Sequence, residues 1–403
     1  MVVVQINFSC TWGSTGNICD SISNILSEQE IENYIFYIYG DNPQNNSNYI
    51  KYGDWAYTKF QALKSKIFGN YGFNSILSTK WLIRKLDQIK PDIVHIHNIH
   101  GHDCHFGMLF KYLRAKGIKT FYTFHDCWAF TGYCPHFTME KCDNWLKGCG
   151  NCPLSARSSW FVDKSAQNFN RKREALSGLD LTIITPSQWL GDLVKKSFLK
   201  DYPVKIIHNG IDLSVFRPMK STFREAYKLQ NKKIVLGVAL MWSKAKGLDV
   251  FLQLAKKLPK EYQIVLVGTD DRVDKLLPPN IISIHRTQSQ QELAEIYSAA
   301  DVFVNPTREE VLGLTNIEAL ACGTPGITFN SSGASECYDK TCGSVVDCDD
   351  LVTLEREIIR ICTENPYLKE TCIKTAKKFD KNEKFKEYLE LYERVNASGI
   401  KRN

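Results

Sequence analysis

Short runs of β-branched and aromatic residues alternate with longer amphipathic stretches along the whole chain. The apolar runs predict strands at residues 2–8, 34–39, 92–97, 119–125, 181–186 and 204–209, and again at 233–239, 262–268, 301–306 and 326–329. The stretches typical of helices are 17–28, 106–116, 188–199, 248–257, 290–299 and 315–322. Strands separated by helices of this length predict right-handed βαβ units and therefore parallel sheets.

The two series of predicted strands indicate two doubly wound α/β domains in tandem. A chain of 403 residues also exceeds the size at which a single core usually keeps growing. The break is expected near residues 216–222, after the Asn-Gly turn at 209–210. The predicted parts are an N-terminal Rossmann-like domain (1–216), a C-terminal Rossmann-like domain (217–380) and a helical tail that returns to the first domain (381–403).

Composition narrows the class of protein. With 43% apolar and 24% charged residues, the chain matches an ordinary globular protein, and no apolar run is long enough to cross a membrane. The N-terminus, MVVVQINFSC, lacks the basic segment of a signal peptide, so a cytoplasmic protein is expected. For such a protein, the 14 cysteines favour reduced thiols or a metal site over disulfides.

The segment EEVLGLTNIEALACGTP at 309–325 combines two acids with a helix start. Glu310 is expected in the loop after a strand, and Glu318 about one turn into the following helix. The backbone N–H groups near Leu314 and Thr315 would then favour a phosphate, and Glu318 could accept both hydroxyls of a ribose. The alternative is that both glutamates are surface acids at a helix start, where acidic residues are common.

Two further segments follow predicted strands of the first domain. The loop CTWGSTGNI at 10–18 places Gly13 and Gly16 at a helix N-terminus, where backbone amides can face a phosphate, although ordinary tight turns also use glycine. His125 ends the strand KTFYTFH, the edge at which α/β sheets bind ligands, although a lone histidine is more often structural.

Seven ordered motifs together resemble the retaining glycosyltransferase family 4, which has the GT-B fold. The similarity covers roughly residues 2–340. The motifs are PDIVHIHN (91–98), His125-Asp126, TPSQW (185–189), HNGID (208–212), GVALMWSKAKGLD (237–249), YSAADVFVNP (297–306) and Glu310-x7-Glu318 with the following AxACGTP. The resemblance implies two Rossmann-like domains that face each other across a cleft, and a hexosyltransferase that moves a sugar from a UDP- or GDP-sugar to a glycan or lipid-linked acceptor.

The resemblance also implies roles for single residues. Glu310 and His125 would contact the transferred sugar as catalytic residues, Glu318 the donor ribose, and Lys246 the pyrophosphate. Gly13 and Gly16 would face the donor phosphates or the acceptor in the N-terminal, acceptor-side domain. Many members carry an arginine shortly before this lysine, and here Lys244 is the available substitute, although it lacks the planar fork of arginine. Leaving-group charge would then be stabilised without a catalytic metal or other required cofactor.

A cysteine-rich insert at 127–152 directly follows His125. Its candidate metal ligands are Cys134, Cys142, Cys149 and Cys152, of which the last two form a Cys-x2-Cys pair. A structural zinc ion would order a segment too polar to form a core, while free thiols and an Fe–S cluster are the alternatives. The insert resembles that of a family 4 subgroup associated with extracellular polysaccharide (colanic-acid-like or capsule) assembly.

The stretch 51–90 carries eight basic groups against two acids, interleaved with aromatic residues. They are Lys51, Lys59, Lys64, Lys66, Lys80, Arg84, Lys85 and Lys90 against Asp54 and Asp87, with Trp55, Tyr57, Phe60, Phe68, Tyr71, Phe73 and Trp81. This pattern fits a face that rests on anionic lipid at the inner side of the cell membrane, or a solvated helix pair with its aromatics in the core.

Two other functions compete with sugar transfer. A nucleotide-sugar epimerase of the same architecture would need no acceptor, and a zinc-containing nucleic-acid or partner-binding protein would use the basic charge. Because the basic groups do not flank the cysteine insert, and such a protein would leave the paired glutamates without a purpose, no nucleic-acid partner is expected.

Overall fold

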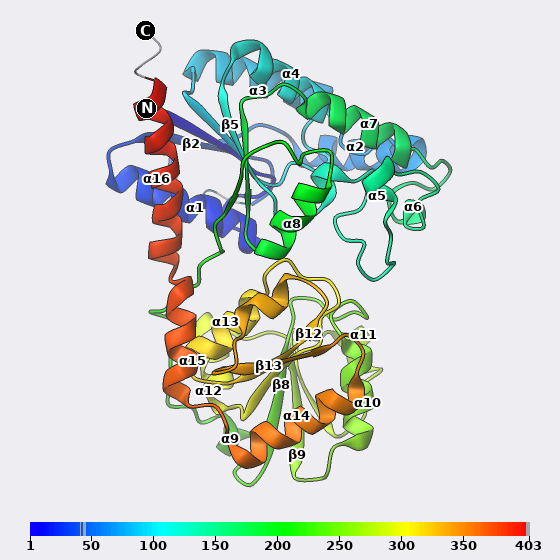
Figure 1. Ribbon diagram of the computed structural model, residues 1–403, viewed down its shortest axis with the longest axis vertical. Coiled ribbons are helices and arrows are strands. Elements are labelled where there is room, and N and C mark those ends of the chain that lie inside the picture. Colours follow the sequence, from blue (N-terminus) through cyan, green and yellow to red (C-terminus); the bar gives the residue numbers. More distant parts are fainter. Residues whose placement is uncertain (41, 43–45, 400–403) are drawn as a thin grey trace. The chain divides into compact units, whose positions relative to one another are not determined.

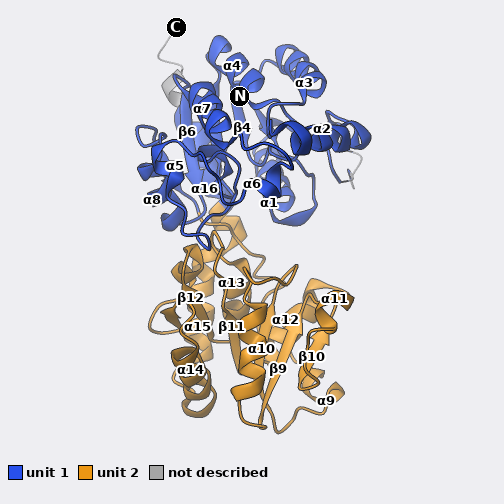
Figure 2. Cartoon of the chain, turned by 90° about the vertical axis from the view of Figure 1, so that its right-hand side faces the viewer, with its two compact units in different colours: residues 1–207, 385–403 blue, residues 208–384 orange. Residues whose placement is uncertain are grey.

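The computed structural model describes residues 1–40, 42 and 46–399 and divides the chain into two compact units (Figure 1 and Figure 2). The first unit consists of residues 1–207 together with the C-terminal segment from Phe385, and the second is His208–Lys384. This junction precedes the expected one at Phe216. The intervening residues pack with the second unit, because Ile211 and Phe216 belong to its core and the Ile211 N–H donates to the Phe379 carbonyl.

A seven-stranded parallel sheet forms the centre of the first unit. Its strands are β1 (Val2–Ile6), β2 (Glu32–Tyr37), β3 (Tyr49–Lys51), β4 (Ile93–Ile96), β5 (Lys119–Thr123), β6 (Leu181–Thr185) and β7 (Val204–Ile206), in the order β3-β2-β1-β4-β5-β6-β7. Nearly every residue of β1, β4, β5 and β6 is buried, as expected for strands that helices cover on both faces.

The helices of the first unit connect successive strands, and the last helix of the chain joins them. They are α1 (Gly13–Glu28), α2 (Trp55–Phe68), α3 (Ile76–Ile89), α4 (Phe106–Lys116), η1 (Trp128–Phe130), α5 (Asn144–Lys147), α6 (Ser155–Ser158), α7 (Ser165–Leu176), α8 (Gln188–Lys196) and α16 (Lys381–Gly399). Phe385, Tyr388 and Tyr392 of α16 share one apolar core with Ile18 and Ile22 of α1. The C-terminal helix is therefore an integral part of the first unit.

A six-stranded parallel sheet forms the centre of the second unit. Its strands are β8 (Lys233–Val238), β9 (Tyr262–Val267), β10 (Ile281–Ile284), β11 (Val302–Asn305), β12 (Gly326–Asn330) and β13 (Gly343–Asp347), in the order β10-β9-β8-β11-β12-β13. Its helices are α9 (Phe223–Ala226), α10 (Leu248–Lys257), α11 (Asp271–Asp274), α12 (Gln290–Ala299), α13 (Leu314–Ala321), η2 (Gly333–Cys337), α14 (Leu351–Glu364), α15 (Lys369–Ala376) and η3 (Lys377–Phe379).

Two separate apolar clusters cover the two faces of this second sheet. Ile234 and Leu236 of β8 pack in one cluster with residues of α12, α13 and α15, whereas Val235 between them packs in the other with residues of α10 and α14. Alternate residues of a strand point to opposite faces, so the sheet is covered on both sides. The predicted fold class, two doubly wound α/β units with parallel sheets, is confirmed.

Three strands lie outside the sequence-based prediction. β3, β10 and β13 are short or carry half-buried and exposed positions, and each is at a sheet edge. Edge strands lack the continuous apolar run that marks a central parallel strand. Among the described residues, no helix combines the length and the apolar character that crossing a bilayer requires.

Candidate functional site

In the second unit, two loops meet at the carboxyl edge of the sheet. β8 and β11 are neighbours, and the segments that follow them, residues 239–247 and 306–313, lie at the same edge. Gly247 has a φ of 77°, and a β-carbon there would lie 2.5 Å from the Pro306 carbonyl oxygen. Only glycine allows this approach of the two loops.

Glu310 and Lys246, one from each loop, form an ion pair. The Lys246 Nζ lies 2.5 Å from Glu310 Oε2, and both side chains are about one-third exposed (33% and 30%). The Glu310 carbonyl also accepts a hydrogen bond from the Gly333 N–H. The two residues expected at the donor sugar and the pyrophosphate are therefore direct neighbours.

Glu318 lies half-buried on α13, one turn after the helix begins at Leu314. The fully buried Tyr297 donates its hydroxyl to Glu318 Oε2 at 3.0 Å. Loss of hydration raises the pKa of Glu318 to about 7, although the Tyr297 hydrogen bond acts in the opposite direction. Leu314 and Thr315 occupy the first turn of α13, where backbone N–H groups have no partner within the helix.

Arg308 fastens the two loops together. It is only 8% exposed and donates to both oxygens of Asp249, at 2.9 and 3.0 Å, and from Nε to Asp349 at 2.8 Å. Its guanidinium also donates to the carbonyl of Lys244, whose own side chain is exposed. Arg308 was not predicted from the sequence, because its carboxylate partners lie 59 and 41 residues away.

Arg308 does not take the place of the arginine that many family members carry before Lys246. Its guanidinium is occupied by Asp249 and Asp349, and these contacts raise its pKa against the effect of burial. Its contacts tie the carbonyl of Lys244 to Asp249 and Asp349.

In the first unit, Gly13 and Gly16 lie in the first turn of α1 and not in a loop before it, because the helix begins at Gly13 and not at the expected residue 17. Gly13 begins α1 with a φ of 69°, and the Ser9 hydroxyl donates to the Trp12 carbonyl at 2.9 Å. A β-carbon on Gly16 would lie 3.0 Å from the Thr11 nitrogen, so the helix start packs tightly against the loop. No acidic residue lies in the first turn of α1, which leaves its N-terminus favourable to an anion.

His125 lies half-buried just beyond β5 and ends a chain of polar side chains. Its Nε2 lies 3.2 Å from His97 Nδ1, and His97 Nε2 lies 3.2 Å from the side-chain oxygen of Gln5. Burial lowers the pKa of His125 to about 4, and the neighbouring charge of Asp126 only partly opposes this. The ring is therefore neutral near pH 7.

Asp126, the residue after His125, pairs with His100. The His100 Nε2 lies 2.7 Å from Asp126 Oδ2, and the Trp128 N–H donates to Oδ1 at 2.8 Å. Burial alone would raise the pKa of Asp126, but His100 lowers it to about 2. A small pocket in this region is lined by His97, His100, His125, Asp126 and their neighbours. Sequence reasoning missed His100, which is not on a strand.

The four candidate metal ligands of the insert are all half-buried, and all 14 cysteines are free thiols. Cys134 and Cys152 are hydrogen-bonded to each other, which lowers the pKa of Cys152 to about 7 and raises that of Cys134. The Gly132 N–H donates to Cys149 Sγ at 3.3 Å. No three of the four sulfur atoms lie mutually within 4.8 Å.

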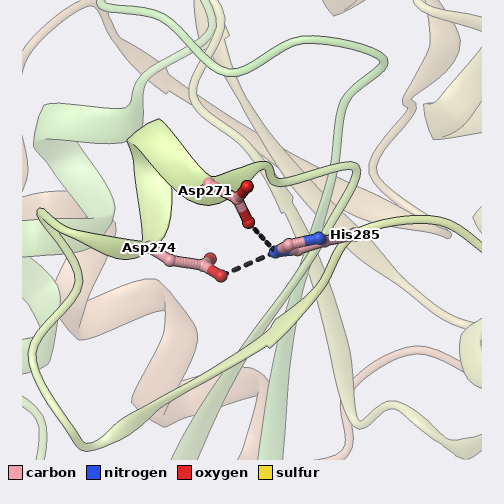
Figure 3. Close-up of side chains that lie close together, drawn as sticks. All are labelled: Asp271, Asp274 and His285. Atoms are coloured by element: carbon pink, nitrogen blue, oxygen red, sulfur yellow. Dashed lines mark hydrogen bonds and ion pairs between the residues drawn. The ribbon is translucent and has the colours of Figure 1, made fainter.

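Among the described residues, one group of three side chains does bring its ligand atoms that close together (Figure 3). His285 Nε2 lies 2.6 Å from Asp274 and 4.0 Å from Asp271, and all three side chains are exposed. The hydrogen bond and charge of Asp274 raise the pKa of His285. This geometry is that of a surface ion pair between α11 and the end of β10.

Comparison with known proteins bears on both units. Residues 57–215 match the model of Glycosyltransferase Family 4, and residues 219–382 match that of glycosyl transferases group 1. The putative colanic acid biosynthesis glycosyl transferase WcaC of Escherichia coli K12 is 22% identical over 98% of this chain and 100% of its own. The O-antigen biosynthesis glycosyltransferase WclY of Escherichia coli is 29% identical over 36% of this chain and 42% of its own.

Solved structures agree in fold at low identity. Sucrose-phosphate synthase from Thermosynechococcus elongatus has a TM-score of 0.72 with 17% identity, covering 98% of this chain and 99% of that one. HepE from Anabaena, in complex with UDP, has a TM-score of 0.68 with 13% identity, covering 98% and 100%. The chain is therefore a glycosyltransferase of the GT-B type, built from a family 4 domain followed by a group 1 domain.

Proposed function

We propose that the chain transfers a sugar, with retention at the anomeric carbon, from a UDP- or GDP-sugar to a glycan or lipid-linked acceptor in cell-surface polysaccharide synthesis. The proposal rests on one arrangement of residues. Lys246 and Glu310 form an ion pair on the loops that follow the neighbouring strands β8 and β11, and the Glu310 loop leads into helix α13, which carries Glu318. The names of similar proteins support it, since they include a colanic acid enzyme, an O-antigen enzyme and HepE in complex with UDP-glucose.

Each residue of the second unit then has a chemical task. Lys246 and the backbone N–H groups at Leu314 and Thr315 stabilise the charge that collects on the departing diphosphate. Glu318 accepts the ribose hydroxyls, and Glu310 accepts a hydroxyl of the transferred sugar. Lys244, whose side chain is exposed, adds positive charge near the phosphates.

In the first unit, His125 serves as a neutral hydrogen-bonding group. Its low pKa leaves one ring nitrogen as donor and the other as acceptor at neutral pH. The contact with His97 engages Nε2, so Nδ1 remains for the sugar or the leaving phosphate. The first turn of α1, which contains Gly13 and Gly16, would bind phosphate or acceptor at the helix N-terminus.

The decisive experiment incubates the protein with UDP-, GDP- and ADP-sugars and measures donor hydrolysis and transfer. Glu318→Ala should weaken donor binding, and Glu310→Ala should mainly lower turnover. Conversion of one nucleotide sugar into another without acceptor would favour an epimerase instead. Wild-type behaviour of both variants would refute the site assignment.

We also propose a structural zinc ion in the cysteine insert, held by Cys134, Cys142, Cys149 and Cys152. Two observations support it. Residues 148–151 all have positive φ, which folds the segment between Cys149 and Cys152 into a tight turn. The fully buried Lys172 has no carboxylate bonded to it and donates to the carbonyls of Trp128 and Thr131, beside these thiols.

Burial lowers the pKa of the Lys172 amine, and the net negative charge of a zinc tetrathiolate would favour its protonated form. Tetrahedral coordination would bring the four sulfur atoms closer together than they lie in this structure. Metal analysis of the purified protein should find about one zinc per chain, lost in Cys149→Ser but kept in the exposed Cys348→Ser. Equal zinc in both variants, or none in the wild type, would contradict the site.

A further inference from the structure

Helix α2 presents its apolar residues to the outside. Its three buried residues are polar, namely Thr58, Gln61 and Ser65. By contrast, its large hydrophobic residues are exposed, with fractions of 57% for Phe60, 44% for Leu63 and 52% for Phe68. A surface helix of a globular protein normally has the reverse arrangement, because burial of apolar area drives its packing.

The inward, polar face of α2 is held by specific contacts. Ser65 Oγ lies 3.1 Å from His102 Nδ1, and Asn74 donates to the same hydroxyl at 2.8 Å. The Thr58 hydroxyl donates to the Asp54 carbonyl, and Asp54 caps the helix by accepting from the Tyr57 N–H. Of these contacts, only those of Ser65 join α2 to other segments, and they hold its polar face inward and leave its apolar face exposed.

Other exposed apolar residues adjoin α2. At the start of α3, Leu77 is 66% exposed, and its N–H donates to the Tyr57 hydroxyl of α2. The segment 160–162 consists of three exposed residues, and the Trp160 N–H donates to the Lys66 carbonyl at the end of α2. We call this set the α2 surface: Trp55, Phe60, Leu63, Phe68, Ile76, Leu77, Trp160, Phe161 and Val162.

Positive charge is interleaved with the α2 surface. Lys59 Nζ lies 5.0 Å from the ring of Trp55, and Lys64 Nζ lies 5.9 Å from the ring of Phe60. Neither acid of residues 51–90 pairs with these lysines, since Asp54 caps α2 and Asp87 pairs with Lys116. Lysines beside exposed aromatic residues suit the boundary between acyl chains and anionic headgroups.

We propose that the α2 surface rests on an anionic lipid bilayer. Contiguous apolar area of this kind on a protein surface marks an interaction site, whereas scattered apolar residues do not. The basic excess selects negatively charged lipid, and a second copy of the same surface would instead place lysines against lysines. The alternative interpretation placed the aromatic residues of 51–90 in the core. This holds for Phe73, which is buried, but not for Trp55, Phe60 and Phe68, which are exposed.

The α2 surface also reaches the loop after β1. The rings of Trp12 and Tyr39 are 5.1 Å apart, and those of Tyr39 and Trp55 are 5.4 Å apart. Trp12, which is 57% exposed, directly precedes Gly13. Under the proposed function, a lipid-linked acceptor held in the bilayer would lie beside this loop, although membrane binding itself does not depend on that function.

The test is sedimentation of the full chain with phosphatidylcholine vesicles, with and without phosphatidylglycerol. Wild type should bind only the anionic vesicles, and high salt should release it. The double variant Phe60→Ser with Leu63→Ser should bind about tenfold more weakly or worse, as should Phe161→Ser with Trp160→Ser. Lys59→Gln with Lys64→Gln should lower both the binding and its salt dependence.

Control variants remove one side chain of the same kind elsewhere. Leu368→Ser takes away an apolar side chain that is 64% exposed in the second unit, and Lys256→Gln removes an exposed charge from α10. Both should bind as wild type. The proposal is overturned if wild type ignores anionic lipid, if the controls lose as much binding as the α2 variants, or if size exclusion shows that the α2 surface joins two chains. Because vesicle binding is measured without turnover, its failure leaves the proposed sugar transfer untouched.

Discussion

Lys246 Nζ and Glu310 Oε2 lie 2.5 Å apart, although 64 residues separate them in sequence. The Glu310 carboxylate is thus paired with the Lys246 ammonium, the group that binds the diphosphate in the proposed function. A negatively charged diphosphate must therefore compete with Glu310 for Lys246, or share it.

Removal of the Glu310 charge should therefore strengthen the binding of a nucleoside diphosphate while it lowers turnover. We expect Glu310→Gln to bind UDP or GDP about three- to tenfold more tightly, because Lys246 is released, and Lys246→Met to bind more weakly and lose about 10²-fold or more in kcat/KM. Isothermal titration calorimetry measures the first effect, and Lys256→Gln is the charge control. Weaker diphosphate binding by Glu310→Gln would contradict this account.

Stability should depend on the ionisation of Glu318. Its pKa is raised from 4.5 to about 7 by burial, so its contribution to stability is fully present below pH 4.5 and is lost as the pH rises through 7. Glu318→Gln should be about 1–3 kcal/mol more stable than wild type at about pH 8, and equal to it at about pH 4.5. Urea unfolding at both pH values measures this.

Glu364→Gln, at an exposed position of α14, is the matched control and should change the free energy of unfolding little at either pH. An unchanged difference between Glu318→Gln and wild type across this range would show that the buried environment does not disfavour the carboxylate.

His125 and His285 should titrate on opposite sides of the usual histidine pKa. Burial lowers the pKa of His125 to about 4, while Asp274 raises that of His285. On acidification from about pH 8, the His285 ring should gain its proton first, and His125 should stay neutral until about pH 5. Imidazole nitrogen NMR, assigned with His125→Gln and His285→Gln, follows both rings in one sample. Titration of His125 near 6.5 would rule out its proposed neutral role.

Loss of the Arg308 side chain should damage both stability and the donor site. Arg308→Ala leaves Asp249 without its bidentate partner and unties the loop of Lys246, so we expect a loss of about 2–4 kcal/mol in unfolding free energy. Arg308→Lys should rescue little, because lysine lacks the planar fork. A structural role alone would leave diphosphate affinity of the folded variant unchanged, whereas a positioning role weakens it.

Local pattern was sufficient for much of the fold and part of the site. Alternating apolar runs and helical stretches predicted the central strands of both sheets, and the short interval from Glu310 to Glu318 placed one acid in a loop and the other on α13. Such inferences succeed because strand and helix periods, and the position of a residue relative to a strand end, depend on near neighbours in the chain.

The partners of these residues came only from the tertiary structure. The contacts of Arg308 with Asp249, of His125 with His97, and of Tyr297 with Glu318 join segments that are distant in sequence, and strand order decides which of them meet. The pKa shifts of Glu318 and His125 likewise follow from the burial that this packing creates.

The chain's own sequence thus determined the order of its elements and the residues that stand at the carboxyl ends of its strands, because these are properties of short segments. Whether the aromatic residues of 51–90 lie in a core or on a surface was left open by the same pattern. Packing decided it, because Ser65 and its neighbours anchor the polar side of α2 and leave Phe60 and Leu63 exposed.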